Sequence, residues 1–258
     1  PRDPGSRLKK SKPMFEPADS LIDFTHLQDD YIDFFQGQSV IPHKYSQIGP
    51  ILEMGDLTGD GLPDLLIGGS KDQPTTFFQN TGNQFLKTEL EGLTVKRSGQ
   101  EADLLILDID QDLDQDVITI SGGYSLEDST RYRHYVYRNE DGKFTKEELP
   151  VDPFVDSVIR AADFDQDGDQ DIFIGCRVKK WGFPRANQSH VLVNTNGNFQ
   201  RSQELSFDLG MVTDAIWTDY DHDGWVDLLI AREWNSLALL HNNQGVLKEV
   251  KLPELEAK

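Results

Sequence analysis

Four copies of an aspartate-rich, nine-residue segment restrict what this chain can fold into. They read DLTGDGLPD from Asp56, DIDQDLDQD from Asp108, DFDQDGDQD from Asp163 and DYDHDGWVD from Asp219, so their starts lie 52, 55 and 56 residues apart. Self-similarity at a fixed period of this size is the signature of a repeat architecture. A unit of about 55 residues cannot bury both of its faces alone, so neighbouring units must stack.

A second marker recurs at the same interval. It consists of an asparagine, a short glycine-containing turn and an apolar residue, as in NTGNQF at Asn80, NEDGKF at Asn139, NTNGNF at Asn194 and NNQGVL at Asn242. Two independent markers that stay in step make a chance repeat an unsatisfactory explanation.

Each unit also contains four short apolar runs, which are rich in Val, Ile, Leu and Phe and are bounded by Gly, Asn and Asp. Such runs are typical of short strands joined by hairpins, and four strands per unit is the composition of a propeller blade. We therefore predict an all-β fold: a β-propeller, or a segment of one, made of four-stranded antiparallel blades. The aspartate segments are expected to form hairpin loops.

The predicted domain organisation follows from these markers. Residues 1–20 read as a linker because prolines are spaced among Lys, Arg and Ser. Residues 21–258 are expected to form the propeller segment. Residues 21–45 lack the markers but alternate in polarity, which suggests an edge strand or a partial blade. The four predicted blades cover about 46–95, 98–150, 154–207 and 211–255.

The aspartate segments have the spacing of a calcium loop. Calcium takes six to eight oxygen ligands, and side chains at positions 1, 3 and 5 of such a loop share a concave face. Position 7 supplies a backbone carbonyl, and Gly at position 6 permits the sharp turn. An EF-hand needs Glu at position 12, whereas these segments have Ile67, Thr119, Ile174 and Ile230 there. An Asp at position 9 instead begins the returning strand and can close the ligand shell.

We therefore predict up to four Ca²⁺ ions, one in each loop. So many carboxylates within nine residues repel one another unless a cation lies among them. Thr58 replaces a carboxylate in the first loop, and Leu113 stands where Gly is expected in the second, so that turn should be strained. The alternative is that some loops are Asx-rich turns without metal. The predicted ligands are Asp56, Thr58, Asp60, Leu62, Asp64, Asp108, Asp110, Asp112, Asp114, Asp116, Asp163, Asp165, Asp167, Asp169, Asp171, Asp219, Asp221, Asp223, Trp225 and Asp227.

Composition excludes several functions and favours a location. The formal net charge of −20 argues against nucleic acid as a partner, because phosphate binding needs basic patches. No apolar run approaches the roughly 18 residues needed to span a bilayer. The single cysteine, Cys176, is expected to be a buried and inert thiol. A chain that uses metal in place of disulfides suits an extracellular or bacterial cell-surface protein, associated with the outer membrane. It reads as a mature product or a segment of a longer polypeptide.

These loops resemble the FG-GAP or VCBS-type calcium repeats of integrin α-subunit propellers and bacterial surface proteins. The stretches SQIGPILEMGDLTGDGLPDLLIGG, AADFDQDGDQDIFIGCR and GMVTDAIWTDYDHDGWVDLLIAREW are also similar to the bacterial branch of the cartilage acidic protein 1 (ASPIC/UnbV-associated) family. The resemblance covers about residues 21–250. It implies a propeller with calcium loops on one face and a role in adhesion or surface binding. Family propellers commonly have seven blades, whereas four aspartate loops are present here.

Two insertions between strands interrupt the repeat, at residues 124–133 and 177–189. The second contains VKKWGFPR, so Trp181, Phe183 and Arg185 form a candidate ligand loop. The alternative for these residues is packing against a neighbouring blade or domain. For Trp234, which could line the same face, the alternative is packing in the core or at the rim.

The predicted function is a binding or adhesion module for a protein or glycan ligand on the cell surface, without catalysis and alongside other domains of a longer polypeptide. The alternative is a calcium-dependent carbohydrate-active enzyme, a lyase or a glycosidase. A glycosidase needs a pair of carboxylates, but nearly all recurrent acids here belong to the metal loops.

Overall fold

The computed structural model describes residues 21–28, 40–42, 44–45, 47–70, 73–94, 99–123 and 129–250. The predicted linker, residues 1–20, lies outside the described residues. The described part contains sixteen strands and one short 3₁₀ helix, η1 (Ser129–Tyr132). None of its helices is long and apolar enough to cross a membrane.

The strands form four separate four-stranded antiparallel sheets, so the fold is all-β with blade-like units, as predicted. Within each sheet the strands follow one another in chain order as a meander. Blade one is β1 (Leu52–Gly55), β2 (Asp64–Ile67), β3 (Thr76–Asn80) and β4 (Phe85–Thr88); blade two is β5 (Gln100–Leu107), β6 (Asp116–Gly122), β7 (Tyr135–Glu140) and β8 (Lys143–Glu148); blade three is β9 (Val155–Ala162), β10 (Asp171–Val178), β11 (Ser189–Thr195) and β12 (Asn198–Phe207); blade four is β13 (Val212–Thr218), β14 (Asp227–Arg232), β15 (Ala238–Asn242) and β16 (Leu247–Val250).

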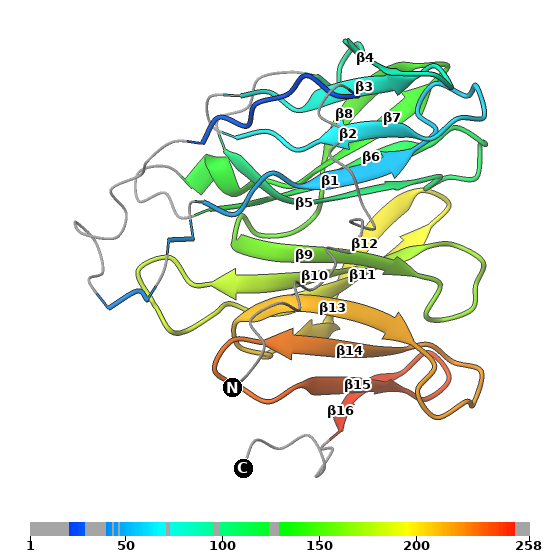
Figure 1. Cartoon of the computed structure of the whole chain (residues 1–258). Coiled ribbons are helices and arrows are strands. Elements are labelled where there is room, and N and C mark those ends of the chain that lie inside the picture. The colour runs from blue at the N-terminus through cyan, green and yellow to red at the C-terminus, as the bar shows by residue number, and fades with distance from the viewer. Residues whose placement is uncertain are drawn as a thin grey trace, which may run out of the picture.

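The four blades are stacked in order from blade one to blade four (Figure 1). Each aspartate loop connects the first strand of a blade to the second, and all four loops lie at the right-hand edge in this view. The connections between second and third strands lie at the opposite edge. We call these the aspartate edge and the opposite edge.

The hydrophobic core is divided into layers between successive blades. Leu66 and Phe77 of blade one pack with Leu104 and Val117 of blade two. The layer between blades two and three includes Ile118, Val136, Ile159, Ile172 and Leu192. The layer between blades three and four includes Phe173, Val191, Ala215, Leu228 and Leu240. Each blade therefore depends on its neighbour for burial, as expected for units whose sheets pack face to face.

Residues that precede blade one pack against other parts of the fold. Ile22 and Phe24 lie against the outer face of blade one, where Phe24 makes an edge-to-face contact with Phe78 at 6.2 Å between ring centroids. The described residues of this segment, 21–28, form no strand. Ile41 and Tyr45 are buried with residues of blades two, three and four, so this part of the chain ties blades together.

Candidate metal centre

The Asp at position 9 holds each aspartate loop to its own blade. Asp64, Asp116, Asp171 and Asp227 are the first residues of the second strands, and each is at most 1% exposed. One carboxylate oxygen accepts the N–H of position 2, at 3.1 to 3.3 Å. The other accepts the N–H of the marker asparagine, at 2.7 to 2.8 Å. This residue therefore joins the aspartate loop to the turn between the third and fourth strands.

The Asp at position 1 shapes the turn itself. Asp56, Asp108 and Asp219 each accept the N–H groups of positions 5 and 6, and Asp163 accepts that of position 6. At position 5 the carboxylate accepts the N–H of position 7 at 2.9 Å in all four loops. These are the Asx-type bonds that allow short acidic side chains to stabilise a tight turn.

Three loops bring carboxylates together as a metal ion requires. Oxygen atoms of positions 1, 3 and 9 lie within 4.8 Å of one another in loops two, three and four. The three groups are Asp108, Asp110 and Asp116; Asp163, Asp165 and Asp171; and Asp219, Asp221 and Asp227. Carboxylate oxygens are the donors that Ca²⁺ prefers.

Strand β15 places an additional nitrogen donor beside the fourth loop. His241 Nδ1 lies 2.9 Å from Asp227 and 3.7 Å from Asp221. His241, Asp221 and Asp223 form a further group of converging ligand atoms. Asp223 is therefore the position 5 residue that belongs to such a group. Ligation by the other position 5 residues, Asp60, Asp112 and Asp167, and by the position 7 carbonyls of Leu62, Asp114, Asp169 and Trp225, stays a prediction.

Burial and like charge act on the same carboxyl groups. Burial raises the pKa of Asp171 to about 7, with nearby Asp165 and Asp167 contributing in the same direction. Burial likewise raises the pKa of Asp116 to about 6, and raises those of Asp64 and Asp165. Asp163 Oδ1 and Asp110 Oδ1 are buried without a hydrogen-bond partner among the described residues. A cation bound among these groups would neutralise the charge and satisfy the unpartnered oxygens, so the donor set fits Ca²⁺.

The first loop differs because position 3 is Thr58. Its hydroxyl donates to Asp64 at 3.3 Å, so the position 3 side chain is still directed toward position 9. Two carboxylates, Asp56 and Asp64, remain in place of three. A weaker metal site is therefore expected in this loop than in loops three and four.

The turn geometry explains the glycine preference at position 6. Gly61, Leu113, Gly168 and Gly224 all have positive φ, and Leu113 has a φ of 81°. A bulky residue in this left-handed region is strained, as expected from the sequence. The Leu113 side chain is 90% exposed, so no burial compensates for the strain.

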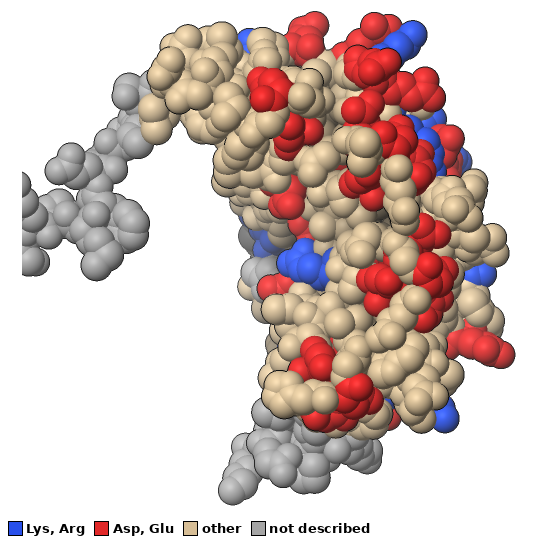
Figure 2. Space-filling view, turned by 90° about the vertical axis from the view of Figure 1, so that its right-hand side faces the viewer, with Lys and Arg blue, Asp and Glu red and all other residues tan. Residues whose placement is uncertain are grey.

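Acidic side chains gather in successive clusters on the face that carries these loops (Figure 2). A family model described as FG-GAP-like repeat matches residues 56–119, 108–174 and 163–230, and each match starts at position 1 of an aspartate loop. Together these matches cover more than half of the chain. The chain belongs to the FG-GAP-like repeat family.

One solved structure supports the architecture of this FG-GAP-like repeat protein. A chain of BBS1N in complex with ARL6DN shares 14% identity over 81% of this chain and 60% of that chain, with a TM-score of 0.50. An Agrocybe aegerita lectin, described as recognising non-reducing terminal N-acetylglucosamine, shares 17% identity over 77% of this chain and 50% of its own, with a TM-score of 0.49. This chain thus spans 50% to 60% of those chains. A search of curated protein sequences found no match.

The marker asparagines join successive FG-GAP-like repeats, a role that the sequence analysis did not identify. The side-chain amides of Asn139, Asn194 and Asn242 donate to the position 2 carbonyls of the preceding blade, at 3.4, 2.9 and 2.7 Å. Asn80, in the first blade, donates to Pro63 of its own blade. The sequence contained one signal for this role: asparagine occupies the marker position in all four units, although other residues could also form the turn.

Two glutamines at position 4 connect adjacent aspartate loops. Gln111 donates to the carbonyl of Gly168 at 2.9 Å, and Gln166 donates to that of Gly224 at 2.8 Å. Loop one has Gly59 at this position. A cavity of about 450 Å³ lies between loops one and two, lined by residues that include Thr58, Gly59 and Leu113.

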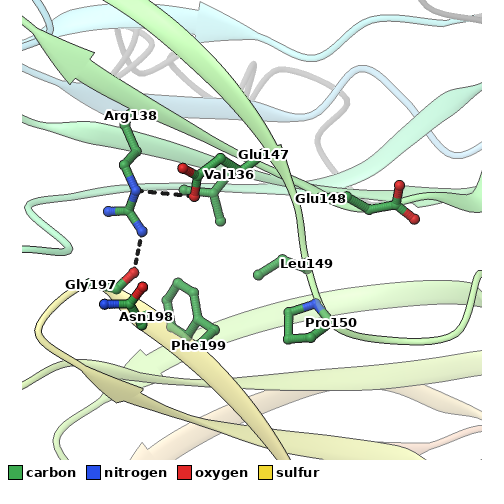
Figure 3. Close-up of a pocket in the computed structure, with 9 residues that line it drawn as sticks. All are labelled: Val136, Arg138, Glu147, Glu148, Leu149, Pro150, Gly197, Asn198 and Phe199. Carbon is green, nitrogen blue, oxygen red and sulfur yellow. Dashed lines mark hydrogen bonds and ion pairs between the residues drawn. The ribbon is translucent and has the colours of Figure 1, made fainter.

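Arg138 supplies a positive charge beside loop two. It extends from β7 toward the hairpin of blade three, in a groove of about 190 Å³ between the two blades (Figure 3). Its guanidinium lies 3.1 Å from Asp110 and also contacts Glu147 and the carbonyl of Gly197. In blade three the corresponding residue before the marker asparagine is Val193. Loop two is therefore partly neutralised by the protein itself.

The candidate ligand loop lies at the opposite edge, between β10 and β11, and its three residues have different environments. Phe183 is 8% exposed and packs against Tyr45 and Trp234, so for this residue the packing alternative applies. Trp181 is 53% exposed, and Arg185 is exposed as well. Trp234 is 63% exposed and contacts Phe183 edge to face at 5.1 Å.

Cys176 is fully buried, and burial raises the pKa of its thiol. A protonated, inaccessible thiol is unreactive, in agreement with the sequence-based expectation.

Proposed function

We propose that this FG-GAP-like repeat protein is a calcium-stabilised binding module that acts outside the cell. It presents loops to a protein or glycan ligand and carries out no catalysis. The observation that supports this proposal best is the convergence of positions 1, 3 and 9 in three successive loops.

The role of the metal is structural. Bound Ca²⁺ supplies positive charge and oxygen coordination among the loop carboxylates. At an affinity near 0.1 mM and about 1 mM Ca²⁺, one site stabilises the folded state by roughly 1.4 kcal/mol. Four sites would contribute roughly 5–6 kcal/mol, which is comparable to the net stability of a domain. Calcium thus takes the part that disulfides play in other extracellular domains.

The proposed location and family branch rest on sequence. FG-GAP-like repeats are typical of extracellular proteins, and one buried cysteine leaves metal as the available cross-link. We propose a position at the bacterial cell surface, associated with the outer membrane, and a relationship to the cartilage acidic protein 1 branch. Other domains of a longer polypeptide would then be natural partners.

Calcium titration tests this proposal. Protein stripped with EDTA is titrated with CaCl₂, or with MgCl₂ for comparison, while binding heat and melting temperature are recorded. We expect up to four Ca²⁺ per chain and a rise in melting temperature. Mg²⁺ should do less, because it demands strict octahedral geometry and gives up its waters reluctantly.

A double variant, Asp163→Asn with Asp171→Asn, should remove one Ca²⁺ from the stoichiometry and part of the calcium-dependent stabilisation. The control is Glu204→Gln with Asp208→Asn, which removes the same charge from exposed residues outside the loops. Equal melting temperatures in EDTA and calcium, together with no binding heat, would refute the proposal.

A further inference from the structure

The segment at residues 177–185, which comprises the end of β10 and the loop after it, has a composition unlike that of the rest of the chain. It reads RVKKWGFPR, with four cationic residues and no acid, in a protein of net charge −20. It projects from blade three at the opposite edge, away from the aspartate loops. A local reversal of charge in an acidic protein indicates attraction to an anionic ligand.

Backbone hydrogen bonds within this loop fix its conformation. Lys179 N–H donates to the carbonyl of Arg185 at 2.7 Å, and two further backbone bonds, both at 2.8 Å, close the turn around Gly182. Below it, Arg177 pairs with Glu233 of blade four at 2.5 Å and lies over the ring of Tyr45. The turn is therefore closed by its own backbone bonds and its base is joined to blade four, which lowers the entropy cost of binding.

The exposed groups at the tip have a different character. Trp181 and Trp234 expose more than half of their surface, and each has a φ near +60°. Bulky side chains rarely adopt this strained conformation, and such strain concentrates at ligand sites. Lys179 and Arg185 are exposed and form no ion pair with any described residue. This edge therefore exposes two indoles and two cationic side chains.

We propose that this loop, together with Trp234, binds an acidic polysaccharide whose sugars are uronic acids. This inference rests on the proposed function and specifies its ligand class. The indole of Trp181 stacks on the C–H face of a pyranose ring, whose electropositive hydrogens meet the negative face of the aromatic system. Lys179 and Arg185 bind uronate carboxylates, and Arg185 can do so with two parallel hydrogen bonds.

The shape of the site favours a glycan over an acidic peptide. Phe183 is buried and contacts Trp234 edge to face, so this loop exposes the Trp181 indole and not the Phe183 ring. The residues that dominate protein interfaces usually occupy well-packed pockets, whereas an exposed indole offers a flat surface. A uronate chain instead repeats a flat ring and a charge along its length, which suits a surface that carries both indoles and cations.

Calorimetric titration of the calcium-loaded full chain tests this assignment. The probes are trigalacturonate, the neutral cellotriose and an oligoglutamate peptide, each at 150 and 500 mM NaCl. We expect binding of trigalacturonate that weakens with salt, and at least tenfold weaker binding of cellotriose and oligoglutamate. Trp181→Ala and the double variant Lys179→Glu with Arg185→Glu should each weaken trigalacturonate binding at least tenfold, whereas Trp181→Phe should retain part of it.

The matched control is Lys87→Glu with Lys248→Glu, which reverses two exposed charges on β4 and β16 and should change the affinity less than twofold. Three results overturn the assignment: no binding of trigalacturonate, equal binding by Trp181→Ala, or oligoglutamate binding as tight as that of the uronate. Calcium-dependent melting is recorded on the same samples. A failure of this assignment is therefore distinguishable from a failure of the calcium-stabilised scaffold.

Discussion

The two edges of the blades differ in how regularly their structure repeats from blade to blade. At the aspartate edge the same hydrogen bonds recur in each blade. The position 9 carboxylate accepts the N–H of position 2 and the N–H of the marker asparagine. At the opposite edge the connections differ in length and sequence, and the two longest carry Tyr132, Trp181 and Phe183. Recurrence indicates a demand common to all blades, which is stability. Variation at the opposite edge leaves room for a specific ligand.

The largest effect should come from pH, at the aspartate edge of metal-free protein. The folded-state pKa of Asp171 is raised to about 7, so the folded protein retains this proton to a higher pH than the unfolded chain. The contribution of Asp171 to the free energy of unfolding is therefore most favourable below pH 4. It is lost as the pH rises toward 7. A rise in the pKa of Asp171 from 3.8 to about 7 corresponds to at most about 4 kcal/mol.

Urea unfolding in EDTA between pH 4.5 and 7.5 measures this loss. The Asp171→Asn variant should lose less unfolding free energy between pH 4.5 and 7.5 than the wild type. Added calcium should make the stability of the wild type equal at the two pH values. An identical pH dependence of the two proteins would contradict the assigned pKa.

The second largest effect concerns the contacts between blades. Asn242→Ala should destabilise by about 2–4 kcal/mol, because it leaves the carbonyls of Phe164 and Val226 without a buried donor. Asn80→Ala is the matched change in blade one, where the amide donates only to Pro63 among the described residues, and should cost about 1 kcal/mol. Chemical denaturation measures both. Equal losses would show that the asparagine acts within its own blade only.

A smaller effect is expected at position 6. Leu113→Gly should stabilise by about 0.5–1 kcal/mol, since it relieves a left-handed leucine that is almost fully exposed. The reverse change in loop three, Gly168→Leu, should destabilise by about 1 kcal/mol although nothing lies within 4 Å of the added Cβ. Melting curves in saturating calcium provide the measurement. Stabilisation by both substitutions would show that backbone strain does not control this position.

The smallest effect on stability should come from the opposite edge. Trp181→Ala should change the free energy of unfolding by no more than about 0.5 kcal/mol, because the side chain is half exposed. Thermal and urea unfolding both report it. A loss above about 2 kcal/mol would mean that Trp181 supports the fold, and the distinction between the two edges would weaken.

Several features were accessible from the sequence because they arise locally. The recurring aspartates and asparagines predicted the repeat, and the four short apolar runs in each unit predicted the blades. Leu113 predicted a strained turn. The all-β fold and the FG-GAP-like family follow from these local signals. Position 9 was identified because an Asp stood where the returning strand begins, and position 9 is where the loop meets the blade.

Tertiary structure decided everything that joins one unit to another. Only the stacked blades show that Asn194 donates to Ile109, that Arg138 contacts the carbonyl of Gly197 in the next blade, and that Phe183 is buried while Trp181 is exposed. Local spacing specifies turns and strands through backbone geometry and hydrogen bonds a few residues apart. Contacts between residues more than fifty positions apart depend on how the sheets pack, and no short segment of sequence encodes that packing.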